Sequence, residues 1–156
     1  MIFVNFKTYE GGSGEKAISL VKIIEDVATS TQIKIIPVVQ IIDLKRIVNS
    51  TKLEVWVQKI DPISYGAHTG ATPPEEIVSS GARGTFLNHS ESKIQEWESL
   101  VRSVEKAREV DLKTLVFSSS LEELEKNTEL KPDFLAYEPS ELIGSTDISV
   151  ANAQPE

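Results

Sequence analysis

A lysine, a histidine and a glutamate each follow a short apolar run in this sequence of 156 residues. Lys7 comes directly after the first run, His89 comes after the fourth and Glu138 after the sixth. Taken singly, each has an ordinary interpretation: a surface lysine, a core histidine with a backbone partner, or a solvated carboxylate. Side chains of these types bind anions and transfer protons when they meet. Their equivalent positions along the chain predict that they converge on one site.

The apolar runs alternate with stretches in which apolar residues recur at helical spacing. Strands are expected at 2–6, 34–39, 53–58, 84–87, 113–118 and 134–137. Helices are expected at 15–28, 41–49, 75–80, 92–110 and 121–128. This alternation predicts an α/β fold with a parallel sheet, and the nearly continuous apolar runs indicate that both faces of the sheet are covered. The strand centres are about 26 residues apart, so six strand–helix units fill the chain.

Two architectures fit this pattern: an open doubly wound sheet and part of a (β/α)8 barrel. The pattern alone does not choose between them. In both architectures ligands bind at the carboxyl ends of the strands, so the polar residues that follow the runs are the candidate site residues. Besides the three named above, these are Asn5, Gln58, Lys59, Asn88, Ser90, Glu91 and the serines at 118–120.

The composition excludes several classes of function. The absence of cysteine excludes a disulfide framework, a thiolate metal site and a cysteine nucleophile. The net charge of -8 disfavours nucleic acids and anionic membranes as partners. No apolar run approaches the ~18 residues of a membrane span, and the N-terminus does not have the pattern of a signal peptide, so a cytoplasmic location is expected. The two histidines, His68 and His89, lack zinc-ligand spacing, so no metal is expected.

Two local patterns concern the helix expected at 121–128. Ser120 is expected to cap its N-terminus, with Glu123 three residues further on in a capping-box arrangement. The glutamates of this segment are expected to form a solvated helix face. They are Glu122, Glu123, Glu125 and Glu129.

The strand-end residues, taken in order, resemble those of the triosephosphate isomerases in their shorter archaeal form. The matching segments lie at 4–9, 61–63, 66–70, 84–85, 87–91, 137–139 and 141–144. They keep their order over the whole chain, and the Asn-Phe-Lys and Asn-His-Ser-Glu segments are specific in combination. The resemblance implies a (β/α)8 barrel of the TIM type, with about six of its eight β/α units in residues 1–156 as a single incomplete domain.

The resemblance also implies an activity, the interconversion of glyceraldehyde 3-phosphate and dihydroxyacetone phosphate through an enediolate. Glu138 resembles the base that moves a proton between adjacent carbons. His89 resembles the neutral electrophile that polarises the carbonyl group. Lys7 resembles the cation that binds the anionic substrate. No cofactor and no metal are implied.

Four further residues are implied to bind the substrate. Asn5 and Phe6 directly precede the lysine. Ile143 and Gly144 lie in a segment similar to the lid loop that closes over the substrate phosphate. The loop 59–72 resembles the family's interdigitating loop, which implies a homo-oligomer, either a dimer or a tetramer.

Two departures from the family pattern affect what we expect of the chain. Lys59 stands where the family usually has histidine or asparagine. The sequence also stops where a sixth helix is expected, and the resemblance implies that strands seven and eight carry the backbone amides for the substrate phosphate. We therefore expect weak or no turnover from the isolated chain, two unpaired sheet edges and a barrel interior open to water.

Two alternative interpretations remain open at the level of the sequence. One is a non-catalytic remnant that acts as a binding or assembly module on an open α/β sheet. The other is an enzyme on an open α/β sheet that acts on a different substrate.

Overall fold

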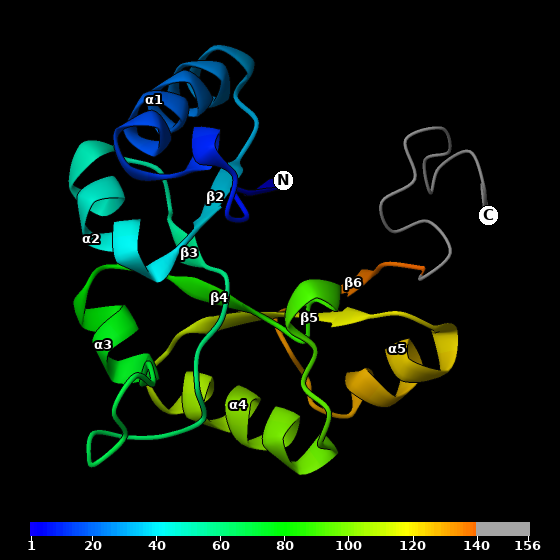
Figure 1. Ribbon diagram of the computed structural model, residues 1–156. Helices are drawn as coiled ribbons and strands as arrows, with labels where there is room; N and C mark the ends of the chain where they lie inside the picture. The colour runs from blue at the N-terminus through cyan, green and yellow to red at the C-terminus, as the bar shows by residue number, and fades with distance from the viewer. Residues whose placement is uncertain (140–156) are drawn as a thin grey trace.

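The computed structural model describes residues 1–139 and contains one sheet of six parallel strands (Figure 1). The strands are neighbours in the order in which they occur along the chain, from the first to the sixth. Their bounds are β1 (Ile2–Asn5), β2 (Ile35–Val39), β3 (Trp56–Val57), β4 (Gly84–Leu87), β5 (Lys113–Ser118) and β6 (Phe134–Tyr137). Sequential order without a reversal is the topology of a barrel wall, whereas a doubly wound sheet reverses its order. The fold is therefore a part of a (β/α)8 barrel.

Five α-helices connect these strands and pack on the outer face of the sheet. They are α1 (Gly14–Thr31), α2 (Ile41–Ser50), α3 (Pro74–Ser79), α4 (Trp97–Glu109) and α5 (Leu121–Thr128). Two short 3-10 turns, η1 (Glu10–Gly12) and η2 (Ser90–Ser92), follow β1 and β4. Alternate strand residues face the helices: in β2, Ile35 and Val39 belong to the outer core, while Ile36 and Val38 face inward. Among residues 1–139, no helix is both long and apolar enough to cross a membrane.

The inner face of the sheet carries a second, aromatic core. Trp56 lies at its centre and is fully buried, and its ring packs against Phe3 and Phe134. The other buried members are Ile36, Val38, Phe86, Leu115 and Phe117, and each is at most 8% exposed. The expectation that the barrel interior is open to water is therefore wrong. Bulky aromatic side chains fill the space between the first and the last described strands.

Gly84 makes room for the Trp56 side chain in this inner core. A Cβ atom at position 84 would lie 2.1 Å from Cε2 of the indole, a separation that side-chain atoms do not adopt. Gly84 and Trp56 are paired across neighbouring strands, so the missing side chain of one accommodates the large side chain of the other. The packing thus requires a glycine in the first position of β4.

The predicted element bounds differ from the structure most clearly at two places. A helix was expected at 92–110, but α4 begins only at Trp97. The segment before it is held by the Asn88 side chain, whose Oδ1 accepts a hydrogen bond from the Ile94 backbone N–H at 3.1 Å. The third strand was expected at 53–58, but only Trp56–Val57 pair with both neighbouring strands. The other strands begin and end within one residue of the expected positions.

Candidate active site at the carboxyl edge of the sheet

His89 and Glu138 face each other at the carboxyl ends of β4 and β6. Nε2 of His89 lies 3.6 Å from Oε1 of Glu138. The Glu138 backbone is fixed by a hydrogen bond of 2.8 Å from its N–H to the carbonyl of Ser118, at the end of β5. The other carboxylate oxygen, Oε2, is buried and has no hydrogen-bond partner within the described part of the chain. A buried acceptor without a donor is unusual in a folded protein and marks Glu138 as a candidate functional residue.

The orientation of the His89 ring is fixed by one hydrogen bond and by packing against two aromatic rings. The Glu91 backbone N–H donates to Nδ1 at 3.1 Å, which assigns the proton of the neutral ring to Nε2. The ring packs edge-on against Phe117, with centroids 4.8 Å apart, and lies parallel to Phe86. The Nε2–H group therefore points towards Glu138 and the neighbouring cavity, where it can donate to a ligand oxygen.

Lys7 adopts a left-handed backbone conformation that its neighbours hold in place. Its φ is +49°, which is unfavourable for a residue with a side chain. Oδ1 of Asn5 accepts from the Lys7 backbone N–H at 3.0 Å, and Nε2 of Gln58 donates to the Lys7 carbonyl at 2.9 Å. Gln58 also donates to Asn5 at 3.2 Å. Two residues, Asn5 of β1 and Gln58 at the end of β3, thus hold the backbone from which the lysine side chain projects.

The Lys7 ammonium is paired with a carboxylate of the same site. Nζ donates to Oε1 of Glu91 at 3.0 Å. This hydrogen bond raises the pKa of Lys7 above its ordinary value, and the charges of Glu91 and Glu138 add to the effect against a smaller opposing contribution from burial. The lysine is consequently a permanent cation at neutral pH.

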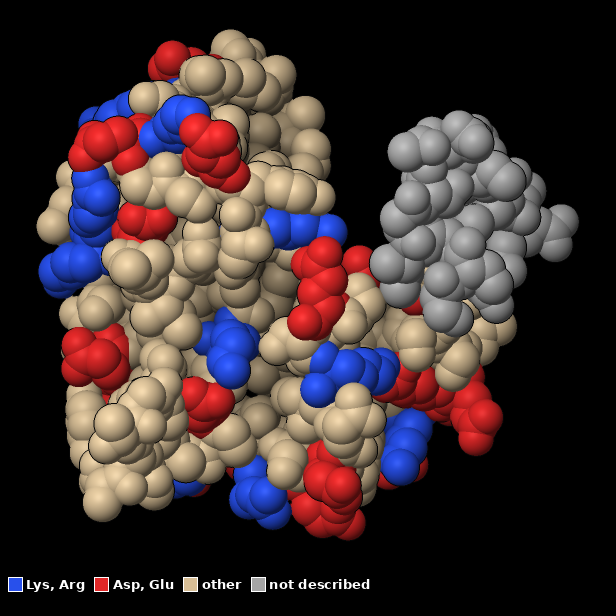
Figure 2. Space-filling view, viewed as in Figure 1, with Lys and Arg blue, Asp and Glu red and all other residues tan. Residues whose placement is uncertain are grey.

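Except for Glu138, these residues line one cavity of about 450 Å³, which is large enough for a small phosphorylated molecule. Its lining comes from the ends of three strands and comprises Asn5, Lys7, Thr8, Tyr9, Gln58, Lys59, Phe86, His89, Glu91 and Ser92. Glu138 lines a separate, smaller cavity, of about 190 Å³, together with Asn88 and Ser90. Lys59 is half exposed, with its ammonium 3.5 Å from Oδ1 of Asp61. Acidic and basic side chains are interspersed over the visible face of the molecule, so a single-sign field does not mark the site (Figure 2).

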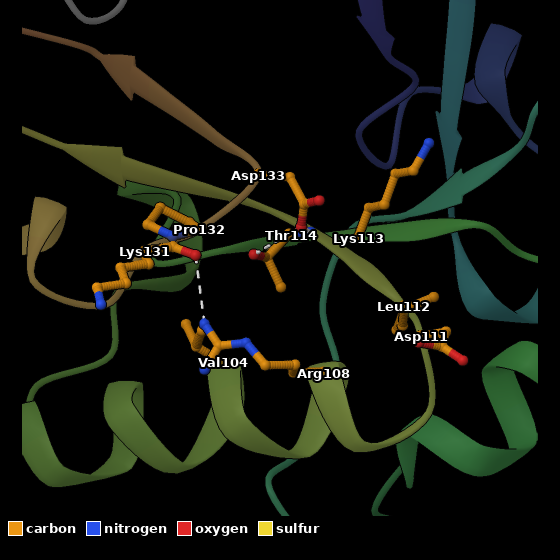
Figure 3. A pocket seen from close by; sticks show the side chains of 9 residues that line it. All are labelled: Val104, Arg108, Asp111, Leu112, Lys113, Thr114, Lys131, Pro132 and Asp133. Atoms are coloured by element: carbon orange, nitrogen blue, oxygen red, sulfur yellow. Dashed lines mark hydrogen bonds between the residues drawn. The ribbon is translucent and has the colours of Figure 1, made fainter.

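A second cavity of about 450 Å³ lies at the opposite, amino ends of β5 and β6 (Figure 3). The Arg108 guanidinium in this cavity donates to the carbonyls of Leu130 at 2.8 Å and Lys131 at 3.2 Å. It is therefore bound to the backbone of its own chain. Active sites of barrel enzymes lie at the carboxyl ends of the strands. The cavity beside His89 is therefore the candidate site.

The remaining sequence-predicted site residues do not line this cavity. Phe6 is 3% exposed and packs in the outer core, where it anchors the segment that carries its neighbours Asn5 and Lys7. Ile143 and Gly144 lie outside the described residues. Within residues 1–139, histidine and acidic side chains do not form a group of three that could hold a metal ion.

From the sequence, no role was assigned to three residues that the structure places at or beside the site. Gln58 and Glu91 were noted only as polar residues after strands, and their position there is the signal that marks them. Glu123 was expected on a solvated helix face together with its neighbours. Its side chain is instead only 24% exposed and lies behind the site.

Comparison with known proteins decides the family. A family model described as triosephosphate isomerase matches residues 1–123. The chain belongs to the triosephosphate isomerase family. A triosephosphate isomerase from Methanobacterium bryantii is 39% identical over the whole of this chain, which covers 68% of that relative. One from Methanothermus fervidus is 38% identical, again over the whole chain, with 69% of the relative covered.

The fold agrees with a solved triosephosphate isomerase structure. That of the Bartonella henselae protein superposes with a TM-score of 0.74 at 22% identity, over 89% of this chain and 67% of the other. The matched family model takes in the Asn5–Lys7 segment and the Asn88–Glu91 segment, and the archaeal triosephosphate isomerases extend the match to Glu138.

Proposed function

We propose that the residues around the cavity beside His89 catalyse the triosephosphate isomerase reaction, in which glyceraldehyde 3-phosphate and dihydroxyacetone phosphate interconvert. The observation that carries this proposal is the 3.6 Å distance between Oε1 of Glu138 and Nε2 of His89, because His89 lines the same cavity as Lys7. A base, a hydrogen-bond donor and a cation within reach of one small molecule are what proton abstraction next to a carbonyl requires.

In the proposed reaction Glu138 removes a proton from the carbon next to the substrate carbonyl. The C–H bonding electrons form the carbon–carbon double bond of an enediolate, and negative charge develops on the former carbonyl oxygen. The Nε2–H group of His89 donates to that oxygen, and the Lys7 ammonium stabilises the substrate anion and the developing charge. His89 gives its Nε2 proton to the former carbonyl oxygen and takes the hydroxyl proton from the oxygen on the neighbouring carbon. Glu138 then returns its proton to the former carbonyl carbon while the second oxygen forms the new carbonyl, so both residues end as they began.

The binding roles of the other predicted residues remain part of this proposal. Asn5 sets the backbone of Lys7, and Phe6 holds the segment in the core. Ile143 and Gly144 belong to the proposed lid over the phosphate. The non-catalytic alternative is not favoured, because the base, the electrophile and the cation are all present.

Exchange of substrate hydrogen for deuterium is the most sensitive test of the proposal. The 156-residue chain is incubated with dihydroxyacetone phosphate in deuterium oxide, and loss of the hydroxymethyl proton signal is followed by NMR. We expect exchange above the buffer rate, weaker than in a longer relative, and its loss in Glu138→Gln. Glu125→Gln, which removes an exposed carboxylate on α5, should leave the rate unchanged. Exchange at the buffer rate, or exchange that survives Glu138→Gln, would overturn the proposal.

We also propose that the chain forms a homo-oligomer, a dimer or a tetramer, through the loop 59–72. The base of this loop is closed by Asp61 and Thr72, whose backbone and side-chain atoms form two hydrogen bonds, and Tyr65 near its tip is 66% exposed. Ile42, at the start of α2, is 83% exposed. A large exposed apolar side chain at the same edge of the sheet is suited to a contact between subunits. Light scattering should detect an oligomer that Tyr65→Ser with Ile42→Asp converts to a monomer.

The remaining partner assignments are also proposals. We propose a cytoplasmic location, with a triose phosphate as the ligand and neither nucleic acid nor membrane as a partner. The net charge of -8 supports this, because it opposes association with polyanions.

A further inference from the structure

We propose that Glu123 of α5 is a positioning residue that fixes the direction of His89 by holding Asn88. The inference deepens the proposed function, on which the role of His89 rests. It starts from the backbone of Asn88, which precedes His89 and has a φ of +62°. Asparagine adopts this left-handed region more readily than most residues with a side chain, and here the hydrogen bonds of the buried amide hold it there. The conformation of Asn88 determines where the chain turns out of β4, and so where the His89 ring points.

The Asn88 side chain uses its hydrogen-bonding groups to hold that conformation. The residue is 3% exposed, so its side chain forms its hydrogen bonds with protein groups and not with water. Its Nδ2 donates to the Phe117 carbonyl at 2.9 Å and to Oε1 of Glu123 at 2.8 Å, and its Oδ1 accepts from the Ile94 N–H. Without Glu123, one N–H of a buried amide would lose its partner, which is costly. Glu123 is the only charged group among the partners of Asn88 within the described residues.

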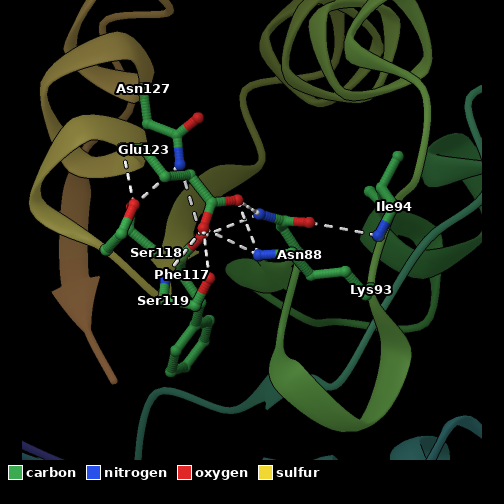
Figure 4. Close-up of polar contacts among 9 residues, drawn as sticks. Asn88, Lys93, Ile94, Phe117, Ser118, Ser119, Glu123 and Asn127 are labelled. Carbon is green, nitrogen blue, oxygen red and sulfur yellow. Dashed lines mark hydrogen bonds and ion pairs between the residues drawn. The ribbon is translucent and has the colours of Figure 1, made fainter. Parts of the chain in front are cut away.

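Glu123 is itself held rigidly by donors from two other segments (Figure 4). Ser119 donates to Oε2 of Glu123 from its backbone N–H at 2.7 Å and from its hydroxyl at 2.8 Å. The Lys93 ammonium donates to both carboxylate oxygens, at 2.6 and 2.8 Å. The carboxylate therefore joins the end of β4, the end of β5 and the segment after η2. Five hydrogen bonds hold the carboxylate in one position, and through it they hold the Asn88 side chain.

Phe117 provides a second path from this cluster to His89. Its carbonyl accepts from the Asn88 amide, and its ring packs edge-on against the His89 ring at 4.8 Å. A movement of Asn88 would disturb both the backbone before His89 and the aromatic surface on which the imidazole rests. Helix capping is not the role of the Glu123 carboxylate, because its oxygens accept from Ser119 and not from the cap residue Ser120.

The two histidines of the chain make a direct spectroscopic test possible. In a sample with 15N-labelled histidine at about pH 9, where the ordinary imidazole is neutral, a fixed tautomer gives two widely separated ring nitrogen signals. Tautomer averaging brings them together. We expect a wide separation for His89 in the wild type and a loss of about half of it in Glu123→Ala. His68, which is exposed in the loop 59–72, is the internal reference and is assigned with His68→Gln.

Three variants separate positioning from general destabilisation. Glu122→Ala removes the exposed neighbouring carboxylate of the same helix and should leave the His89 signals unchanged. Lys93→Met removes two of the five hydrogen bonds that hold Glu123 but keeps the Glu123–Asn88 hydrogen bond, so it should reduce the separation less than Glu123→Ala does. In an Asn88→Gly background, removal of Glu123 should have no further effect, because the amide through which it acts is gone. If Glu123→Ala does not fold, Glu123→Gln, which keeps one acceptor oxygen, should show a smaller loss of separation.

The outcomes are distinguishable from those of the isomerase proposal. An unchanged separation in the folded Glu123 variant would overturn the positioning role, as would an equal change in Glu122→Ala. The spectra need no substrate turnover, so a chain that fails the deuterium exchange test but loses the fixed tautomer in Glu123→Ala would contradict only the proposed function.

Discussion

Phe3 and Phe134 pack edge to face, with ring centroids 5.5 Å apart, and thereby connect β1 with β6, the first and last described strands. The two strands are not hydrogen-bonded neighbours in the sheet, so the contact is made by side chains alone. Both rings also pack on the buried Trp56. This aromatic bridge explains how a six-stranded sheet keeps the curvature of a barrel wall with a dry interior.

Loss of either ring should destabilise the fold through this bridge. Both residues are half-buried, so Phe3→Ala and Phe134→Ala should each lower the free energy of unfolding by about 2 kcal/mol, less than a fully buried phenylalanine. Because the rings touch, the double variant should show a coupling of about 1 kcal/mol. Urea unfolding followed by tryptophan fluorescence measures these values. Strict additivity of the two losses would contradict the bridge, and Ile23→Ala, at an exposed position of α1, serves as an apolar control.

Gly84→Ala should destabilise the fold more than the addition of one methyl group usually does. The added Cβ would lie 2.1 Å from the indole of Trp56, which has no free space in which to move. We expect a loss of about 3 kcal/mol or a chain that does not fold, as overpacking of a rigid core predicts. Gly11→Ala is the matched control, because nothing lies within 4 Å of the equivalent position there. Equal thermal midpoints for the two variants would show that the inner core is looser than described.

Acid should destabilise the protein through Glu123. Partial burial opposes ionisation of this carboxyl, but the Lys93 ion pair and the hydrogen bonds from Ser119 and Asn88 outweigh it and lower the pKa to about 2, from an ordinary value of 4.5. A depressed pKa in the folded state gives stabilisation that is complete above about pH 4.5 and is lost as the pH falls towards 2. The stabilisation at stake is about 3 kcal/mol.

The pH dependence of urea unfolding tests this assignment. Wild type should lose stability steeply between about pH 4.5 and 2, and Glu123→Gln should follow a shallower curve that meets it at low pH. Glu122→Gln should keep the wild-type slope. A Glu123→Gln curve parallel to that of wild type over the whole range would contradict the assignment.

Lys7→Met should reduce proton exchange on dihydroxyacetone phosphate by about 100-fold or more, because the proposed mechanism assigns this charge to the substrate anion. The comparison variant is Lys45→Met, which removes the same charge from an exposed position on α2. Exchange is measured by NMR as for Glu138→Gln. Equal rates in the two lysine variants would remove Lys7 from the proposed mechanism, and circular dichroism should confirm that both variants are folded.

Some of these features were accessible from the sequence because they depend on local order. The alternation of apolar runs and helical stretches predicted all six strands, and the strand-end rule placed His89 and Glu138 at one edge of the sheet. The late start of α4 was not predictable, because it depends on where the Asn88 side chain points. The role of Glu123 was hidden for the same reason: its partners Asn88 and Lys93 are 35 and 30 residues away. The dry interior depends on ring contacts that periodicity does not report.

The distance between His89 and Glu138 depends on the shape of the sheet more than on either loop. Their strands, β4 and β6, are separated by β5, and two steps of about 4.8 Å place the strand axes roughly 10 Å apart. The inward curvature of the sheet shortens this separation on the inner face, where the two side chains come within 3.6 Å of each other. A flatter sheet would move the two side chains apart, so the aromatic packing on the inner face also affects the spacing of the proposed proton transfer.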